Sequence, residues 1–201
     1  MRWYRWVLGA LLVPVLLAGT TLLGLVGAGL GSVDGAPHSR GTNGLWLGHA
    51  WVGSPYPQAD LDALVNRVRA GQFRDLFVHV GPLSDNGSLN PALSPGAARL
   101  LTALHASLPG VRVQAWLGDL VGPGRMNLAD PMTRTRIVAG AAQVLELGFA
   151  GVHYDLEPVP SGDAGYLALL AATHTLTQSR HALLSVAADQ LEPVPGVAGP
   201  E

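Results

Sequence analysis

The sequence contains no cysteine and no lysine, and only 13% of its residues are charged. The absence of cysteine excludes a disulfide framework, a thiolate metal site and a cysteine nucleophile. Without lysine, the chain has neither a Schiff-base lysine nor the phosphate-binding lysine of a P-loop. Its 12 basic residues, all arginine, are outnumbered by 14 acidic ones, which gives a formal net charge of -2. This balance excludes a protein that coats nucleic acid with a basic surface, and we expect no nucleic-acid partner.

A long apolar run lies close to the N-terminus. Residues 7–31 contain no charged residue, and two arginines, Arg2 and Arg5, stand just before them. This run is longer than the roughly 7 to 15 residues of a cleaved signal-peptide core, and it reaches the ~20 residues that span a bilayer. We therefore expect residues 1–33 to be an uncleaved signal anchor that forms one transmembrane helix. Secretion after cleavage of a signal peptide is the alternative.

The arginines in front of the apolar run predict its orientation. Positive residues stay on the cytoplasmic side of a membrane, so the rest of the chain is expected on the extracytoplasmic side of the cell membrane, or secreted. Residues 34–43 (DGAPHSRGTN) have the glycine, proline and polar residues of a linker. Residues 44–201 are then expected to form the functional domain.

Hydrophobic residues make up 48% of the chain, and from residue 44 onward they follow strand and helix periods in alternation. The expected strands cover residues 45–52, 75–80, 111–117, 149–157 and 181–188, and the expected helices cover residues 60–70, 94–108, 130–147 and 166–179. Such alternation predicts βαβ units around a parallel sheet. On length alone, a five-stranded doubly wound sheet fits the chain better than a TIM barrel, which takes eight such units. No G-x-G-x-x-G motif follows the first strand, so a dinucleotide site is not expected.

Helix boundaries are marked by capping residues at two places. Ser94 and Asp130 are each followed by proline, which favours a capping residue and then the first helical position. Gly148 follows the third expected helix and is typical of a helix C-terminus.

The stretch GFAGVHYDLEP, residues 148–158, is a strand pattern that ends in polar residues. Side chains alternate along a strand, so His153, Asp155 and Glu157 are expected on one face. Residues two apart lie roughly 6.5 to 7 Å apart at the Cα, close enough for one carboxyl to raise the pKa of the other. A glutamic acid that keeps its proton near neutral pH can protonate a leaving-group oxygen, as glycoside hydrolysis requires. An isolated D-x-E pair more often caps a turn or binds an arginine.

This stretch resembles the family 18 glycoside hydrolases, the chitinase-like group, whose fourth barrel strand carries D-G-x-D-x-D-x-E. Residues 150–157, AGVHYDLE, align with that motif, and the fifth strand LLSVAA is similar to the family's fifth. The resemblance spans roughly residues 44–189. It implies a TIM barrel, of which about five βα units are present, and retaining hydrolysis assisted by the 2-acetamido group of the substrate. It also implies Glu157 as the general acid and Asp155 as the carboxylate that orients the acetamido group and stabilises the charged intermediate.

The sequence departs from the family pattern at several positions. Ala150 and His153 stand where the family usually has aspartate, and QAWLGDL replaces the usual Gly-Gly pattern of the third strand. Within the 201 residues we expect no strands six to eight, which in the family carry a tyrosine and a tryptophan of the sugar site. Three interpretations stay open: a cell-surface hydrolase of polysaccharides that contain N-acetylglucosamine, such as chitin or peptidoglycan; a carbohydrate-binding module without turnover; and an inactive truncated barrel. His153 is expected either to hydrogen-bond Asp155 and bind substrate or to be a buried histidine satisfied by a neighbouring strand.

Other barrel glycosidases also place an acid/base glutamate before a proline at the end of strand four, and Glu157-Pro158 fits them too. Those enzymes generally have asparagine before the glutamate, where this chain has Leu156. The chitinase-like resemblance therefore ranks first.

Aromatic side chains near strand ends are candidates for stacking on sugar rings. Trp116 and Trp51 lie near the carboxyl ends of expected strands, where barrel sites form, and we expect them to contact substrate; packing in the core is the alternative. His49 and His79 fall in the first two expected strands. No H-x-x-x-H pair accompanies them, so we expect neither a metal site nor a cofactor.

Overall fold

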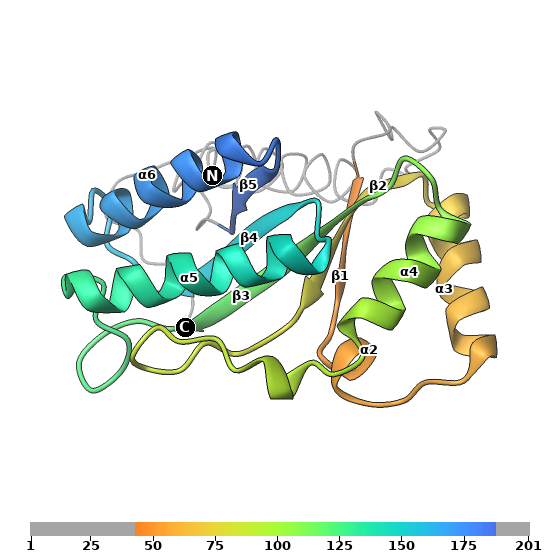
Figure 1. Ribbon diagram of the computed structural model, residues 1–201, viewed down its shortest axis with the longest axis horizontal. Coiled ribbons are helices and arrows are strands. Elements are labelled where there is room, and N and C mark those ends of the chain that lie inside the picture. Colours follow the sequence, from red (N-terminus) through yellow and green to blue (C-terminus); the bar gives the residue numbers. More distant parts are fainter. Residues whose placement is uncertain (1–42, 188–201) are drawn as a thin grey trace, which may run out of the picture. The chain divides into compact units, whose positions relative to one another are not determined.

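The computed structural model describes residues 43–187, which form one α/β unit (Figure 1). Its five parallel strands are β1 (Asn43–Leu47), β2 (Phe73–His79), β3 (Arg112–Leu120), β4 (Gly151–Glu157) and β5 (Leu183–Val186). Their order in the sheet is β1-β2-β3-β4-β5, so every strand pairs with the next one in sequence. A doubly wound sheet reverses its order at a switch point. The doubly wound alternative is therefore wrong, and the order is that of consecutive βα units in a barrel.

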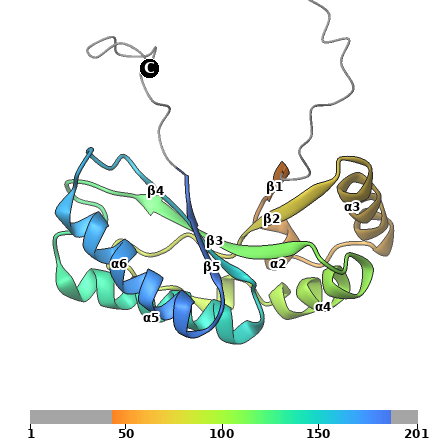
Figure 2. The same cartoon turned by 90° about the horizontal axis from the view of Figure 1, so that it is seen from above.

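The helices are α2 (Ala50–Gly53), α3 (Gln58–Ala70), α4 (Ala97–Ser107), α5 (Pro131–Leu147) and α6 (Ala164–Ser179), with the 3₁₀ turn η1 at Pro91–Leu93. Crossovers between parallel strands are right-handed, so crossovers that all advance in one direction leave their helices on one face of the sheet. Figure 2 shows the helices along that face. No helix of residues 43–187 covers the other face, which we call the open face and which carries Phe77, His79, Gln114, Trp116, His153 and Asp155.

The hydrophobic core lies between the sheet and the helices. Val78, Leu117 and Val152 on the three central strands are fully buried there. They pack with the apolar stripes of the helices, to which Val68 on α3 and Ile137 on α5 belong. Burial of each side chain of this size stabilises the fold by about 1.5 to 3 kcal/mol relative to an exposed position. The alternation that buries these residues turns their neighbours to the open face.

The first expected strand, residues 45–52, is too long. β1 ends at Leu47, and the second half of the apolar run forms the short helix α2. Val52 of α2 is fully buried, and its carbonyl oxygen accepts a hydrogen bond from the Gly96 amide, 2.8 Å away. An apolar run of this length does not distinguish a strand from a buried helical turn, which explains the error.

The capping predictions had different outcomes. Ser94 was expected to cap a helix, but α4 begins three residues later with Gly96 as its N-cap. In contrast, the Asp130 carboxylate accepts hydrogen bonds from the amides of Met132 and Thr133, as expected of an N-cap. Gly148 ends α5 in the left-handed region, at φ 108°, which confirms its predicted role.

The expected signal anchor (residues 1–33) and all of the expected linker except Asn43 lie outside the described residues. Within residues 43–187, no helix is long and apolar enough to cross a membrane.

Candidate active site

The polar end of β4 lies on the open face, as the strand period predicted. Tyr154 is fully buried on the opposite side, where its hydroxyl lies 2.9 Å from Oγ1 of Thr173 on α6. His153, Asp155 and Glu157 therefore share the other side of β4. Along this series exposure increases toward the end of the strand, because His153 is buried, Asp155 is half-buried and Glu157 is exposed.

An aromatic floor supports the amino-terminal part of this series. The ring of Phe77 lies 4.7 Å from that of Trp46 and 4.2 Å from the imidazole of His153, measured between centroids. Trp46 also reaches the imidazole edge-on at 5.9 Å, which leaves His153 only 3% exposed. Trp46 itself remains 53% exposed and presents an aromatic surface beside the site. Sequence reasoning did not select Trp46, although its place in the first strand was the available signal.

A second aromatic layer comes from the ends of β2 and β3. The rings of His79 and Trp116 lie 4.7 Å apart, and His49 contacts His79 edge-on at 5.6 Å. Burial lowers the pKa of His79, the neighbouring His49 lowers it further, and the Asp155 carboxylate raises it in part. Both His79 and His49 therefore lie in the site, although no site role was predicted for them.

The carboxylate of Asp155 changes the pKa of side chains in both aromatic layers. Burial lowers the pKa of His153, and Asp155 acts in the opposite direction by stabilising the imidazolium. Burial raises the pKa of Tyr166 on α6, and the negative charge of Asp155 raises it further. The carboxylate of Asp155 thus acts electrostatically on side chains from β2, β4 and α6.

A chain of hydrogen bonds crosses the open face below the site. Arg112 and Gln114 on β3 both donate to the carboxylate of Asp75, and the Gln114 bond is 3.0 Å long. Ser185 on β5 donates to Oε1 of Gln114 at 2.9 Å, and its Oγ also lies 2.9 Å from Nδ1 of His153. Nδ1 of His153 is thus bonded to a neighbouring strand, whereas its buried Nε2 has no hydrogen-bond partner among the described residues. Sequence reasoning missed this chain, whose only signal was polar residues at alternating strand positions.

The predicted site residues divide into two groups. The structure brings Trp116, His153, Asp155 and Glu157 together at the carboxyl ends of β3 and β4, where Gly118 pairs with Asp155 in the sheet register. Trp51 does not join them. It lies in α2 and not in a strand, and its ring packs against Tyr56 at 5.1 Å on the helix side of the molecule.

Glu157 stands where β4 leaves the sheet. Its carbonyl oxygen accepts a hydrogen bond from the Val121 amide at 2.9 Å, which joins the ends of β3 and β4. The next residues, Pro158 to Pro160, border a cavity of about 720 Å³ whose other wall is the loop of residues 121–129. Glu157 itself does not line this cavity, which begins at the next residue, Pro158.

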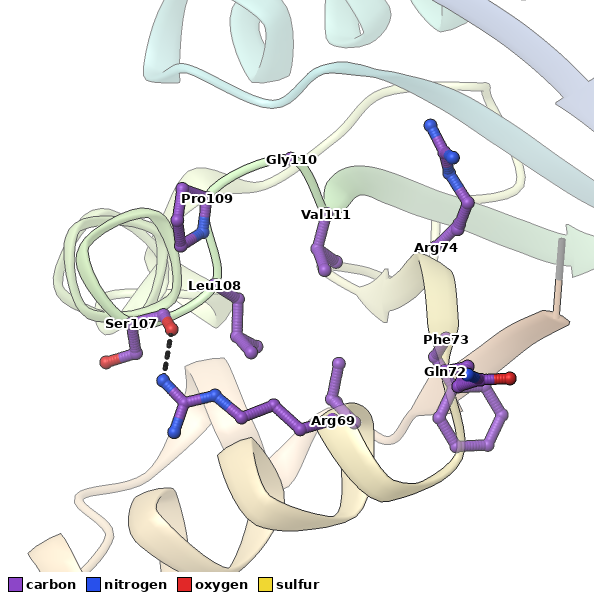
Figure 3. Close-up of a pocket in the computed structure, with 10 residues that line it drawn as sticks. Arg69, Gln72, Phe73, Arg74, Ser107, Leu108, Pro109, Gly110 and Val111 are labelled. Atoms are coloured by element: carbon purple, nitrogen blue, oxygen red, sulfur yellow. Dashed lines mark hydrogen bonds between the residues drawn. The ribbon is translucent and has the colours of Figure 1, made fainter. Parts of the chain in front are cut away.

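Another cavity, of about 890 Å³, lies at the opposite end of the sheet, near the start of β2 and β3 (Figure 3). Figure 3 shows Arg69 reaching from α3 to the end of α4, where it donates to the Ser107 carbonyl oxygen at 2.7 Å. The lining contains no carboxylate and no histidine. In barrel folds this end serves stability and the strand carboxyl ends carry the chemistry, so we place the candidate site at Glu157.

Metal binding was not expected from the sequence. Within the described part of the chain, no group of three or more histidine, aspartate or glutamate side chains is arranged to hold a metal ion.

No protein-family model and no curated protein matches the sequence. Solved structures do match the fold. The C-terminal domain of a provisionally named chitinase from Desulfitobacterium hafniense DCB-2 has a TM-score of 0.58 and 16% identity, over 72% of this chain and 45% of that chain. The GH18 chitinase ChiB of Flavobacterium johnsoniae has a TM-score of 0.53 and 14% identity, over 72% and 45%. A hypothetical protein from Ruminiclostridium thermocellum ATCC 27405 has a TM-score of 0.51 and 13% identity, over 71% and 96%.

These likenesses concern the fold. They confirm the chitinase-like fold that the β4 motif predicted, in an α/β arrangement with a parallel five-stranded sheet. The chain spans less than half the length of the two chitinase chains that it matches.

Proposed function

We propose that this chain is a chitinase-like glycoside hydrolase that acts on a polysaccharide containing N-acetylglucosamine, with Glu157 as the general acid and Asp155 as its partner. One observation carries the proposal. Asp155 and Glu157 stand together at the carboxyl end of β4, on the open face of a sheet whose fold is shared with GH18 chitinases.

The exposure of the two carboxyl groups suits different roles. Glu157 is exposed at the end of the strand, where it can reach a glycosidic oxygen and give it a proton. Asp155 is half-buried beside two histidines, where a fixed negative charge stabilises positive charge on a bound sugar ring more strongly than it would in water. In a substrate-assisted reaction, Asp155 would also orient the 2-acetamido group that attacks the anomeric carbon.

The side chains around the carboxyl pair supply surfaces for a sugar. Trp116 lies beside Asp155 and His153 on the adjacent strand, and an indole ring in this place can stack on the apolar face of a pyranose. His153 belongs to the proposed substrate site through its position below Asp155. The substrate contact predicted for Trp51 remains a prediction, and its position against Tyr56 offers it no support.

Hydrolysis of a chromogenic chito-oligosaccharide by the full chain tests this proposal. We expect Glu157→Gln to lower kcat by at least about 100-fold, since the amide cannot donate the proton that the leaving group needs. The matched control is Glu146→Gln, which removes an exposed glutamate of α5 that pairs with Arg180 outside the site. Equal rates for the parent and Glu157→Gln would contradict the assigned role of Glu157.

Binding without turnover is a second candidate function. It is favoured by Ala150 and His153, which occupy two positions where the resembled family has aspartate. In that case calorimetry detects chito-oligosaccharide binding by the parent and by Glu157→Gln with the same affinity, and neither protein releases product. Binding with measurable release by the parent alone would support the hydrolase.

We also propose that residues 7–31 anchor the chain in a membrane, with the domain on the extracytoplasmic side. The length of the apolar run and the two preceding arginines support this location. Protease treatment of intact cells should degrade the domain while the anchor stays in the membrane fraction. Recovery of the undegraded chain in the cytosolic fraction would contradict the proposed location.

A further inference from the structure

A groove lies along the edge of the sheet that β1 forms. β1 pairs with β2 alone, so its other side has no neighbouring strand among residues 43–187. Residues 45–48 line the groove on this side, and α3 lines it on the other. Two strands separate β1 from β4, which amounts to roughly 14 Å in a sheet. The groove, of about 380 Å³, is therefore distinct from the candidate site at Glu157, and it has the size of a small-molecule site.

Two tryptophans, Trp46 and Trp51, line this groove. Trp46 is the exposed tryptophan of β1. Trp51 is half-buried, and its ring packs against Tyr56, which in turn lies under the guanidinium of Arg99 at 4.9 Å. These contacts hold the indole of Trp51 in place while part of it stays accessible. A fixed indole offers a flat apolar surface on which the apolar face of a sugar ring can stack.

Two side chains of opposite charge, Asp60 and Arg67, line the groove from α3, and both are exposed. They stand seven residues apart, which is about 10 Å along the helix axis and too far for an ion pair. Neither forms an ion pair with any other residue in the range 43–187. Ala63 lies between them on the same face of the helix, and its small side chain leaves the space between the two charges open. The groove thus offers a ligand one charged acceptor and one charged donor.

We propose that this groove binds a neutral oligosaccharide. Trp46 and Trp51 contact the apolar faces of its sugar rings. Asp60 accepts hydrogen bonds from its hydroxyl or amide N–H groups, and Arg67 donates to its oxygens. One charge of each sign disfavours the alternatives, because Asp60 repels a polyanion and Arg67 repels a polycation. That the sugar is N-acetylglucosamine rests on the proposed function.

Trp46 connects the groove to the candidate active site. It lines the groove, and its ring also contacts Phe77 and His153 on the open face. A polysaccharide long enough to reach both places is held by the groove while another part of the same chain lies at Glu157. Binding at the second place is then intramolecular, which raises the affinity for long chains above that for short ones.

Calorimetry with a chito-oligosaccharide tests the proposal in the full chain carrying Glu157→Gln. Binding at the groove should be detected in addition to any binding at the candidate active site. Ala63→Gln fills the groove from an exposed position, and Asp60→Asn removes the charged acceptor; each should weaken binding at the groove by at least about tenfold. The matched control is Asp62→Asn, because Asp62 is exposed on the same helix, accepts from Gln58 and does not line the groove. Equal affinity and stoichiometry in all of these variants would overturn the proposal.

The ¹H–¹⁵N spectrum of the full chain locates the bound sugar. The indole N–H signal of Trp51, identified by its loss in Trp51→Phe, should shift when the chito-oligosaccharide is added. The shift should persist in Asp155→Asn and disappear at the same sugar concentration in Ala63→Gln. A Trp51 signal that does not move, or that moves equally in Ala63→Gln, would overturn the proposal. Because this readout requires neither turnover nor Asp155, failure of the proposed hydrolase activity is distinguished from failure of the groove to bind sugar.

Discussion

Replacing Tyr154 with phenylalanine and Thr173 with valine should destabilise the fold by different amounts, although both changes break the same hydrogen bond. The Thr173 hydroxyl donates to the Leu169 carbonyl oxygen at 3.0 Å, so the proton of the bond between the two side chains comes from Tyr154. Both residues are fully buried between β4 and α6. Tyr154 is therefore the donor and Thr173 the acceptor of a fully buried hydrogen bond.

The magnitudes follow from what each change leaves behind. Tyr154→Phe removes the donor and leaves Thr173 with its bond to Leu169, so we expect a loss of about 0.5 to 1.5 kcal/mol in the free energy of unfolding. Thr173→Val leaves the Tyr154 hydroxyl buried without a partner, which should cost about 1 to 3 kcal/mol. Removing both groups leaves no orphan, so the double variant should be more stable than Thr173→Val alone.

Chemical denaturation of the full chain measures these differences. Thr175→Val is the matched control, because Thr175 is exposed on the same helix and bonds only to the Ala171 carbonyl oxygen; its change should stay within about 0.5 kcal/mol. A double variant as unstable as the sum of the single ones would refute the assignment of donor and acceptor. If Tyr154→Phe lost no stability, the placement of the Tyr154 side chain in the core would be in question. The placement of Asp155 on the opposite face of β4 would then be in question too.

Three further outcomes are expected. The folded-state pKa values of His153 and His79 lie below the 6.5 of a free histidine, so the unfolded chain binds more protons at acidic pH. The free energy of unfolding should therefore fall as pH drops below about 6.5, by at most ~1.4 kcal/mol per pH unit for each histidine. Denaturation midpoints at pH 7.5 and 5.5 check this: they should differ, less so in His153→Gln, and equal midpoints in the parent would contradict the prediction. Gly148→Ala forces a side chain into φ 108° and should lower stability by about 1 to 2 kcal/mol in thermal unfolding, whereas an unchanged Tm would show that the α5 terminus rearranges. Gly118→Ala places a methyl 2.7 Å from the Asp155 carbonyl oxygen and should displace β4 at the site, lowering hydrolysis more than stability; full activity would argue against a fixed Asp155.

Some of the site was predictable from local pattern because it depends on the period of a single strand. The alternation in residues 148–158 places His153, Asp155 and Glu157 on one side whatever the neighbours of the strand are. The Asp130 cap and the Gly148 terminus of α5 were predictable for the same reason, since their hydrogen bonds connect residues a few positions apart. Element boundaries that depend on a distant partner could not be predicted in this way. The start of α4 is an example, because the Gly96 amide donates a hydrogen bond to the carbonyl oxygen of Val52.

By itself, the sequence determined the alternation of strands and helices and the face of β4 that carries the carboxyl groups, since both follow from periods read within one element. Tertiary structure decided which strands are neighbours, and thereby excluded a doubly wound sheet. It alone joined Gln114 to Ser185, 71 positions away, and Ser185 to His153. Such contacts depend on the order and register of the strands. The alternation of residues within one strand does not reveal which strand lies beside it. The setting of Asp155 is for this reason a property of the assembled sheet.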